Sequence, residues 1–145
     1  MSIAAVVATI ATGLFAGAAA YITLVEHPAR LACGPALAIR QFRPSYHRGA
    51  VMQASLAAIG CAAALARWWV SGSLAWLAGG ALIGALIPFT LIVVFPTNTR
   101  LLDERLDSAS SDAAMLLRRW GRLHAVRTVL GVAAFVLFVV RLSLD

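Results

Sequence analysis

An unbroken apolar run covers residues 3–24 and contains no charged residue. A helix needs about 20 apolar residues to cross a bilayer, so this run is long enough to span one. Two comparable runs cover 49–66 and 74–95, and the second is interrupted only by Pro88. A fourth run, 128–140, spans only if the polar residues before it join the same helix. The pattern is that of an integral membrane protein.

Composition supports this class. Hydrophobic residues make up 61% of the chain, charged residues only 12%, and the mean hydropathy is +0.87. A soluble domain carries about 25% charged residues. We therefore predict an all-α fold, an integral membrane four-helix bundle with antiparallel up-down topology and two longer loops on one side. The predicted single transmembrane domain covers 1–145, with helices at about 3–24, 49–70, 74–96 and 120–142.

The arginines predict how the bundle is oriented. The net charge is +6, and every basic residue is Arg. Nine arginines lie in the segments 25–48 and 97–123, whereas only Arg67 and Arg141 lie on the side of the N-terminus. The positive-inside rule places both long loops in the cytoplasm and both termini outside, as in a bacterial inner membrane protein. We expect the basic charge to contact anionic lipid head groups and not nucleic acid.

Small residues mark possible packing faces. Gly13 and Gly17 form a GxxxG pair in the first run, and Gly80 and Gly84 form another in the third. Such pairs let helices approach closely in lipid, either within the bundle or in a homo-oligomer. Continued at 3.6 residues per turn, each small-residue face leads to polar residues at the loop end of its helix. The sequence therefore predicts a polar pocket at the cytoplasmic end.

Eight residues are candidates for lining this pocket: Glu26, His27, Tyr46, Gln53, Asn98, Trp120, His124 and Arg127. Polar groups along the whole bundle axis would indicate a channel, but these groups gather at one end. That asymmetry favours a one-sided pocket. It does not separate an enzyme from a binding protein.

Arg127 and His124 are the central candidates for chemistry. A guanidinium cannot lose its proton, so Arg127 needs a partner at membrane depth, and Glu26 is expected to pair with it. Such a pair could simply hold the helices together, or Arg127 could stabilise an anionic oxygen formed in a reaction. His124 could act as a general base, or could be a structural histidine bonded to Asn98 or to a backbone carbonyl.

Other chemistry finds less support in the sequence. Glu26, His27, His47 and His124 could supply a metal site, but no H-x3-H, ExxH or CxxC spacing is present. No cofactor is favoured, and a metal or haem is the alternative. Tyr46 and Trp120 could stack on a planar ligand or belong to the membrane interface. No phosphate loop, Rossmann fingerprint or nucleophile elbow appears, which excludes a nucleotide-dependent enzyme of the usual kind.

Four segments together resemble a known family. They are YITLVEHPAR (21–30), FRPSYHRGAVMQAS (42–55), PFTLIVVFPTNTRLL (88–102) and LLRRWGRLHAVRT (116–128). They resemble the anthrone-oxygenase-like family of small four-helix membrane proteins, above all its bacterial branch, whose members mostly have no assigned function. Fungal members are linked to the oxidation of anthrones to anthraquinones. The most specific part is the Asn-containing end of the third segment followed by Trp-x3-His-x2-Arg.

The resemblance implies a membrane-embedded oxidoreductase that acts on a lipophilic phenolic or quinone-like molecule from the cytoplasmic side. In this hypothesis His124 takes a proton, Arg127 holds the resulting anion, and Asn98 orients one of them. Glu26 completes the catalytic set, while His27, Tyr46, Gln53 and Trp120 bind the substrate. The alternative is a non-enzymatic membrane protein: a small-molecule binder, a transporter subunit or an assembly factor.

Overall fold

The computed structural model describes residues 2–144 and confirms the all-α class. Four continuous helical segments, Ile3–Ala32, Pro35–Ser71, Leu74–Leu102 and Ser111–Ser143, are each long and apolar enough to cross a membrane. The first consists of α1 (Ile3–Tyr21), the π-turn η1 (Ile22–Glu26) and α2 (His27–Ala32). The second is α3 (Pro35–Ser71). The third consists of α4 (Leu74–Phe89), the π-turn η2 (Thr90–Val94) and α5 (Phe95–Leu102), and the fourth is α6 (Ser111–Ser143).

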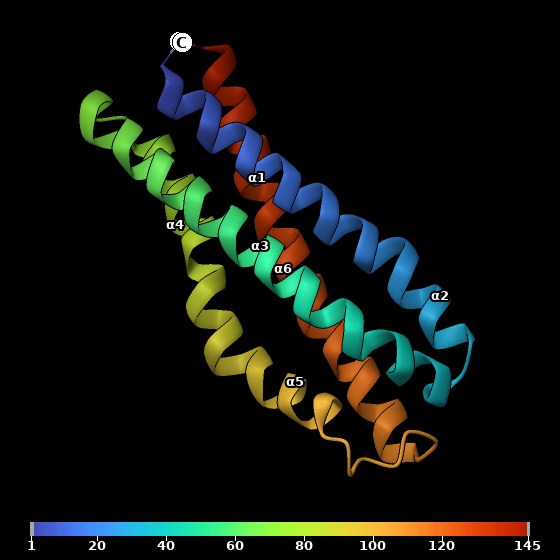
Figure 1. The fold of residues 1–145 in the computed structure, drawn as a ribbon. Helices are drawn as coiled ribbons and strands as arrows, with labels where there is room; N and C mark the ends of the chain where they lie inside the picture. Colours follow the sequence, from blue (N-terminus) through green and yellow to red (C-terminus); the bar gives the residue numbers. More distant parts are fainter. Residues whose placement is uncertain (1, 145) are drawn as a thin grey trace.

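Consecutive helices run in opposite directions and lie next to each other around the bundle (Figure 1). The start of α1 and the end of α6 lie at the same end as the tight turn at Gly72, which adopts φ +64° and closes α3. At the opposite end lie the turn at residues 33 and 34 and the loop 103–110, and we call this the basic end. The outer surface of the bundle is apolar, as expected for a lipid-facing surface. It exposes side chains such as Ile10, Leu14, Leu91, Val129 and Val136.

The expected long loop over 25–48 is wrong. Helix continues to Ala32 and resumes at Pro35, with only residues 33 and 34 between the two helices. Pro35 occupies the start of α3, where a missing N–H costs nothing. Gly34, at φ +81°, provides the sharp reversal between the two helices. Pro44 lies inside α3, which continues through it.

In the first and third helical segments the helix continues through a proline because a π-turn precedes it. In η1 the His27 N–H donates to the Ile22 carbonyl, and Pro28 follows directly. In η2 the Phe95 N–H donates to the Thr90 carbonyl, and Pro96 follows directly. Local π adjustments of this kind reorganise the backbone hydrogen bonds around a proline, so a membrane helix can continue through it. The two helical hairpins thus repeat one plan: a π-turn, a proline, a reversal, and a longer helix.

The last helix begins earlier than the predicted residue 120. Its N-cap is Ser110, whose hydroxyl oxygen accepts a hydrogen bond from the Ala113 N–H. Asp112 lies in the first turn, where its negative charge interacts favourably with the positive end of the helix dipole. Asp112 also forms an exposed ion pair with Arg100, 2.7 Å away. The second loop therefore shrinks from the expected 97–123 to 103–110.

Three of the four glycines in the GxxxG pairs lie at close contacts, and a Cβ added to Gly13 would lie 2.7 Å from the Phe135 ring. A Cβ added to Gly80 would lie 3.2 Å from the Ala64 Cβ, and one added to Gly84 would lie 2.8 Å from the Cys61 sulfur. These glycines therefore allow α4 to pack closely on α3. At Gly17, in contrast, a Cβ would meet nothing within 4 Å. Within the described residues Cys33 and Cys61 are both free cysteines.

The predicted inward stripes hold on the two longest helices and fail on the third. In α3 the buried stripe consists of Gln53, Ala57, Gly60 and Ala64. In α6 it includes Trp120, His124, Gly131 and Ala134. On the third segment the stripe expected through Gly80, Gly84, Ile87 and Leu91 breaks before the π-turn, because Ile87 is 38% exposed, and Leu91 is 62% exposed. Val94 and Asn98, farther along the segment, are buried again.

Candidate functional site

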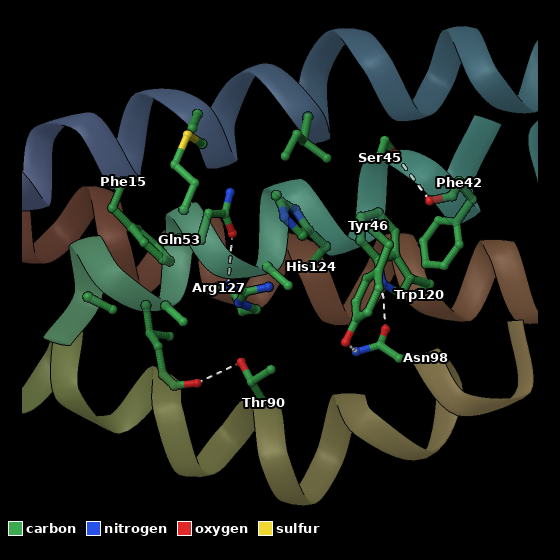
Figure 2. A pocket seen from close by; sticks show the side chains of 18 of the residues that line it. Phe15, Phe42, Ser45, Tyr46, Gln53, Thr90, Asn98, Trp120, His124 and Arg127 are labelled. Carbon is green, nitrogen blue, oxygen red and sulfur yellow. Dashed lines mark hydrogen bonds between the residues drawn. The ribbon is translucent and has the colours of Figure 1, made fainter. Parts of the chain in front are cut away.

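A cavity of about 450 Å³ lies between the helices and extends from the basic end toward the bundle centre. We call it the main cavity. Its size falls within the range of small-molecule sites, about 300–1,000 Å³. Figure 2 shows polar side chains from α3, α5 and α6 entering it among apolar neighbours. It is lined by seven of the eight predicted site residues: Glu26, Tyr46, Gln53, Asn98, Trp120, His124 and Arg127.

Asn98 joins the two aromatic candidates. The Trp120 indole N–H donates to Asn98 Oδ1 at 2.9 Å, and Asn98 Nδ2 donates to the Tyr46 hydroxyl at 3.1 Å (Figure 2). Asn98 is only 2% exposed, and its amide is committed to these two partners. Asn98 makes no direct hydrogen bond to His124 or Arg127 within the described residues, but it bonds to Trp120, which stacks on His124. It fixes two aromatic side chains that line the cavity.

Arg127 has no carboxylate partner among residues 2–144. Its Nη2 donates to Gln53 Oε1 at 2.8 Å, and its guanidinium carbon lies 5.7 Å from the centre of the Phe15 ring. Its Nε is buried with no hydrogen-bond partner in the described chain. The expected Glu26–Arg127 ion pair is wrong. The main cavity therefore contains a guanidinium whose charge the protein does not neutralise.

Glu26 pairs instead with Arg30, a residue that sequence reasoning missed. Arg30 Nη2 lies 2.6 Å from Glu26 Oε1, and the two residues are one helical turn apart. Arg30 Nε also donates to Gln41 Oε1, and its guanidinium lies 5.7 Å from the Trp120 ring. The i, i+4 spacing would have indicated this pair if the helix had been expected to continue past Pro28. Both residues line the basic end of the main cavity.

His124 stacks on Trp120 and bonds to a residue that was not predicted. The two ring centres are 4.7 Å apart, and His124 Nδ1 lies 3.0 Å from the Thr23 hydroxyl. Thr23 lies in the π-turn η1 and contacts Thr128 of α6 at 2.7 Å. Two threonines on apolar helices gave no signal in the sequence. Their importance appears only when α6 is packed against η1.

His27 does not line the main cavity. It lies beside Trp120, with ring centres 5.1 Å apart, and it packs closely against Gly121. It lines a second cavity, of about 460 Å³, which also contains Thr23, Arg118 and Arg122. His124 lines both cavities and so lies between them. Within residues 2–144, the side chains considered as metal ligands are not grouped into a metal site.

The main cavity opens on the apolar side of the bundle. Several side chains that line it are also exposed on the outer surface: Tyr21 (57%), Met52, Leu91 and Phe95. They come from α1, α3, η2 and α5. In a bilayer this surface faces lipid, so the opening leads toward the hydrocarbon region. A lipophilic molecule could therefore enter without crossing water.

The fold and the site define a class: a four-helix membrane bundle with a ligand-sized cavity that combines an apolar opening, an aromatic lining and an unneutralised cation. A family model described as anthrone oxygenase matches residues 42–137. The chain belongs to the anthrone oxygenase family. No curated protein and no solved structure matched the chain.

Proposed function

We propose that the protein is a membrane-embedded oxygenase that oxidises a lipophilic phenolic or anthrone-type molecule in the main cavity, with dioxygen as the oxidant. The observation that carries the proposal is that the Arg127 guanidinium lines the main cavity without a carboxylate partner among residues 2–144. Burying a charge without a partner is costly, and such a charge is normally compensated. Here the compensation would come from an anionic oxygen of the bound substrate.

The reaction can be written with His124 as the base. His124 takes a proton from the acidic CH₂ of an anthrone, and the charge of the resulting anion spreads onto the anthrone oxygen. Arg127 stabilises that oxygen, because a fixed cation in a site with little water strongly favours developing negative charge. The anion carbon then adds dioxygen and a proton to give a hydroperoxide. Loss of water from the hydroperoxide leaves the new carbonyl of the anthraquinone.

The remaining residues bind the flat substrate. Tyr46 and Trp120 supply aromatic surface, and Asn98 holds both in place. Gln53 orients Arg127, while Glu26 and Arg30 form the polar end of the cavity. The lipid-facing opening supports a substrate that partitions into the bilayer. His27 acts only indirectly, through its contact with Trp120.

Oxygen uptake by the purified protein in lipid nanodiscs tests this proposal. With an anthrone as substrate, His124→Gln should lower the rate about 100-fold or more, the range of general base catalysis. Arg127→Gln should lower it to a similar extent. Arg119→Gln, an exposed arginine on the same helix, is the matched control and should keep the wild-type rate.

A wild-type protein that is inactive on a panel of anthrones and phenols, or two active-site variants with full activity, would contradict the proposal. Binding of an anthrone without oxygen uptake would select the binder alternative. Loss of activity on chelation, with recovery on adding a metal, would keep the oxygenase but replace the mechanism.

We also propose that the basic end faces the cytoplasm of a bacterial inner membrane, because nine arginines lie near it. Cys33 is exposed at the basic-end turn and serves as a natural reporter in a Cys61→Ala background. A membrane-impermeant thiol reagent should not label it in intact cells but should label it in inverted vesicles. Ser71→Cys, in a Cys33→Ser, Cys61→Ala background, should behave in the opposite way. The reverse labelling pattern would overturn the orientation.

A further inference from the structure

The proton on His124 can be located from the hydrogen bonds around it. The hydroxyl of Thr128 lies 3.1 Å from the carbonyl oxygen of Ala19. It also lies 3.2 Å from the carbonyl oxygen of His124, on the same helix. A carbonyl oxygen can only accept, so Thr128 is the donor in either of these two contacts. A threonine hydroxyl has a single hydrogen. When Thr128 donates it to one of the carbonyls, none is left for another partner.

The hydroxyl oxygen of Thr23 lies 2.7 Å from the hydroxyl oxygen of Thr128. By geometry alone either hydroxyl could donate in this contact, but when Thr128 gives its hydrogen to a carbonyl, Thr23 is the donor. Thr23 then has no hydrogen for its third contact, the 3.0 Å approach to His124 Nδ1. In that contact Thr23 can only accept. The hydrogen between them must belong to Nδ1.

We infer that Thr23 and Thr128 are positioning residues that hold neutral His124 in the tautomer with its proton on Nδ1. The lone pair is then on Nε2, which has no hydrogen-bond partner within residues 2–144. Free neutral histidine prefers the other tautomer, so this arrangement is imposed by the protein. The role of Nε2 as the base that meets the substrate rests on the proposed function. The assignment of the proton to Nδ1 rests on the hydrogen bonds alone.

The fold provides a reason for the position of Thr23. It lies in the π-turn that precedes Pro28, and this turn packs against α6. Stacking on Trp120 restrains the plane of the His124 ring. Thr23 lines the second cavity and not the main one, so His124 Nδ1 bonds to a side chain outside the main cavity. When Nε2 takes a proton, the Nδ1–H bond to Thr23 is retained.

Nitrogen NMR of the ring tests the inference directly. Protein labelled with ¹⁵N-histidine, at a pH where His124 is neutral, should give a protonated-type signal for Nδ1 and an unprotonated-type signal for Nε2. The signals are assigned by their loss in His124→Gln. Thr23→Val removes the acceptor, and Thr128→Val frees the Thr23 hydrogen to be donated to Nδ1. In both variants the proton should move to Nε2 in most molecules.

Conservative variants and a distant threonine complete the design. Thr23→Ser and Thr128→Ser should restore the wild-type tautomer. Thr9→Val removes a buried hydroxyl that donates to Ala5 on the same helix, away from His124, and should change nothing. A wild-type proton on Nε2, or valine variants that keep the wild-type tautomer, would overturn the inference.

Kinetics separate this inference from the proposed function. In an active protein, both valine variants should lower kcat at least about tenfold with little change in KM, because only the molecules with an unprotonated Nε2 react. An Nδ1–H tautomer in a protein without oxygenase activity would refute the function and keep the inference. An active protein with the Nε2–H tautomer would refute the inference and keep the function.

Discussion

Gln53 and Arg127 meet across the main cavity from matching positions of the two longest helices. Gln53 follows Tyr46 in α3 by the same interval as Arg127 follows Trp120 in α6, and the 2.8 Å hydrogen bond joins them. The amide orients the guanidinium but leaves its charge unbalanced. This relationship yields the first prediction.

Gln53→Glu should stabilise the protein and weaken its activity. The new carboxylate has nearly the same shape as the amide and would neutralise Arg127 inside the bundle. A substrate anion would then compete with an internal partner, and kcat/KM should fall at least about tenfold, equivalent to about 1.4 kcal/mol. Oxygen uptake and resistance to denaturation measure the two effects. Ser111→Glu adds a carboxylate at the exposed start of α6, away from the main cavity, and should leave the rate near wild type.

Removing the charge of Glu26 should destabilise the bundle. Arg30 is 4% exposed at its side chain and Glu26 is 26% exposed, so Glu26→Gln leaves a buried cation without its counter-charge. We expect a cost of about 2–3 kcal/mol, below the ~3–5 kcal/mol of a fully buried pair because Glu26 is partly exposed. Denaturant titration in detergent measures it.

The exposed pair between Arg100 and Asp112 provides the comparison for Glu26. Asp112→Asn should cost less than about 1 kcal/mol, as for surface ion pairs. An equal loss of unfolding free energy in Glu26→Gln and Asp112→Asn would show that burial does not make the Glu26–Arg30 pair stronger than the exposed pair.

Asn98→Leu should disturb the aromatic lining of the main cavity. The substitution leaves the buried Trp120 N–H without an acceptor, which costs about 1–3 kcal/mol. Anthrone binding, followed by quenching of Trp fluorescence, should weaken as well because Tyr46 loses its support. Thr99→Val removes an exposed hydroxyl one residue away and should leave both measurements unchanged. Unchanged binding in Asn98→Leu would mean that the aromatic pair does not contact the ligand.

The second glycines of the two GxxxG pairs should respond in opposite ways to alanine. At Gly84 the new methyl group would meet the Cys61 sulfur at 2.8 Å, and we expect a loss of about 1–3 kcal/mol from overpacking. At Gly17 there is open space, and helix propensity should provide a gain of up to about 1 kcal/mol. Unfolding measurements together with cross-linking in membranes distinguish the outcomes. A loss at Gly17 with weaker cross-linking would assign that face to a homo-oligomer.

Apolar periodicity was sufficient to predict four helices and most of the residues around the main cavity. The stripes on α3 and α6 depend only on helical spacing, and Gln53 and His124 lie on them as expected. The prolines were misleading. Pro28 and Pro44 are helix breakers in water, whereas in these helices the chain continues through both. Because the helix continues around Pro28, Arg30 lies one turn from Glu26. Glu26 therefore pairs with Arg30 and not with Arg127.

The hydrogen-bond partners of His124 could not have been predicted from the sequence. They depend on the π-turn, which shifts the helical register and brings Thr23 to face Thr128. Threonine is common in apolar helices, where its hydroxyl usually bonds to its own helix, as Thr9 and Thr90 do here. Only the packing of two helices distinguishes Thr23 from these.

The sideways opening of the main cavity determines which concentration controls its occupancy. Ligands that arrive through lipid are counted per lipid molecule, not per litre of buffer. Adding substrate-free vesicles that exchange lipid with the sample would dilute such a ligand at constant total amount, and the rate would fall. For the proposed oxygenase, an apparent KM would therefore be a mole fraction in the bilayer, and values from two preparations would agree only when each is divided by its lipid content.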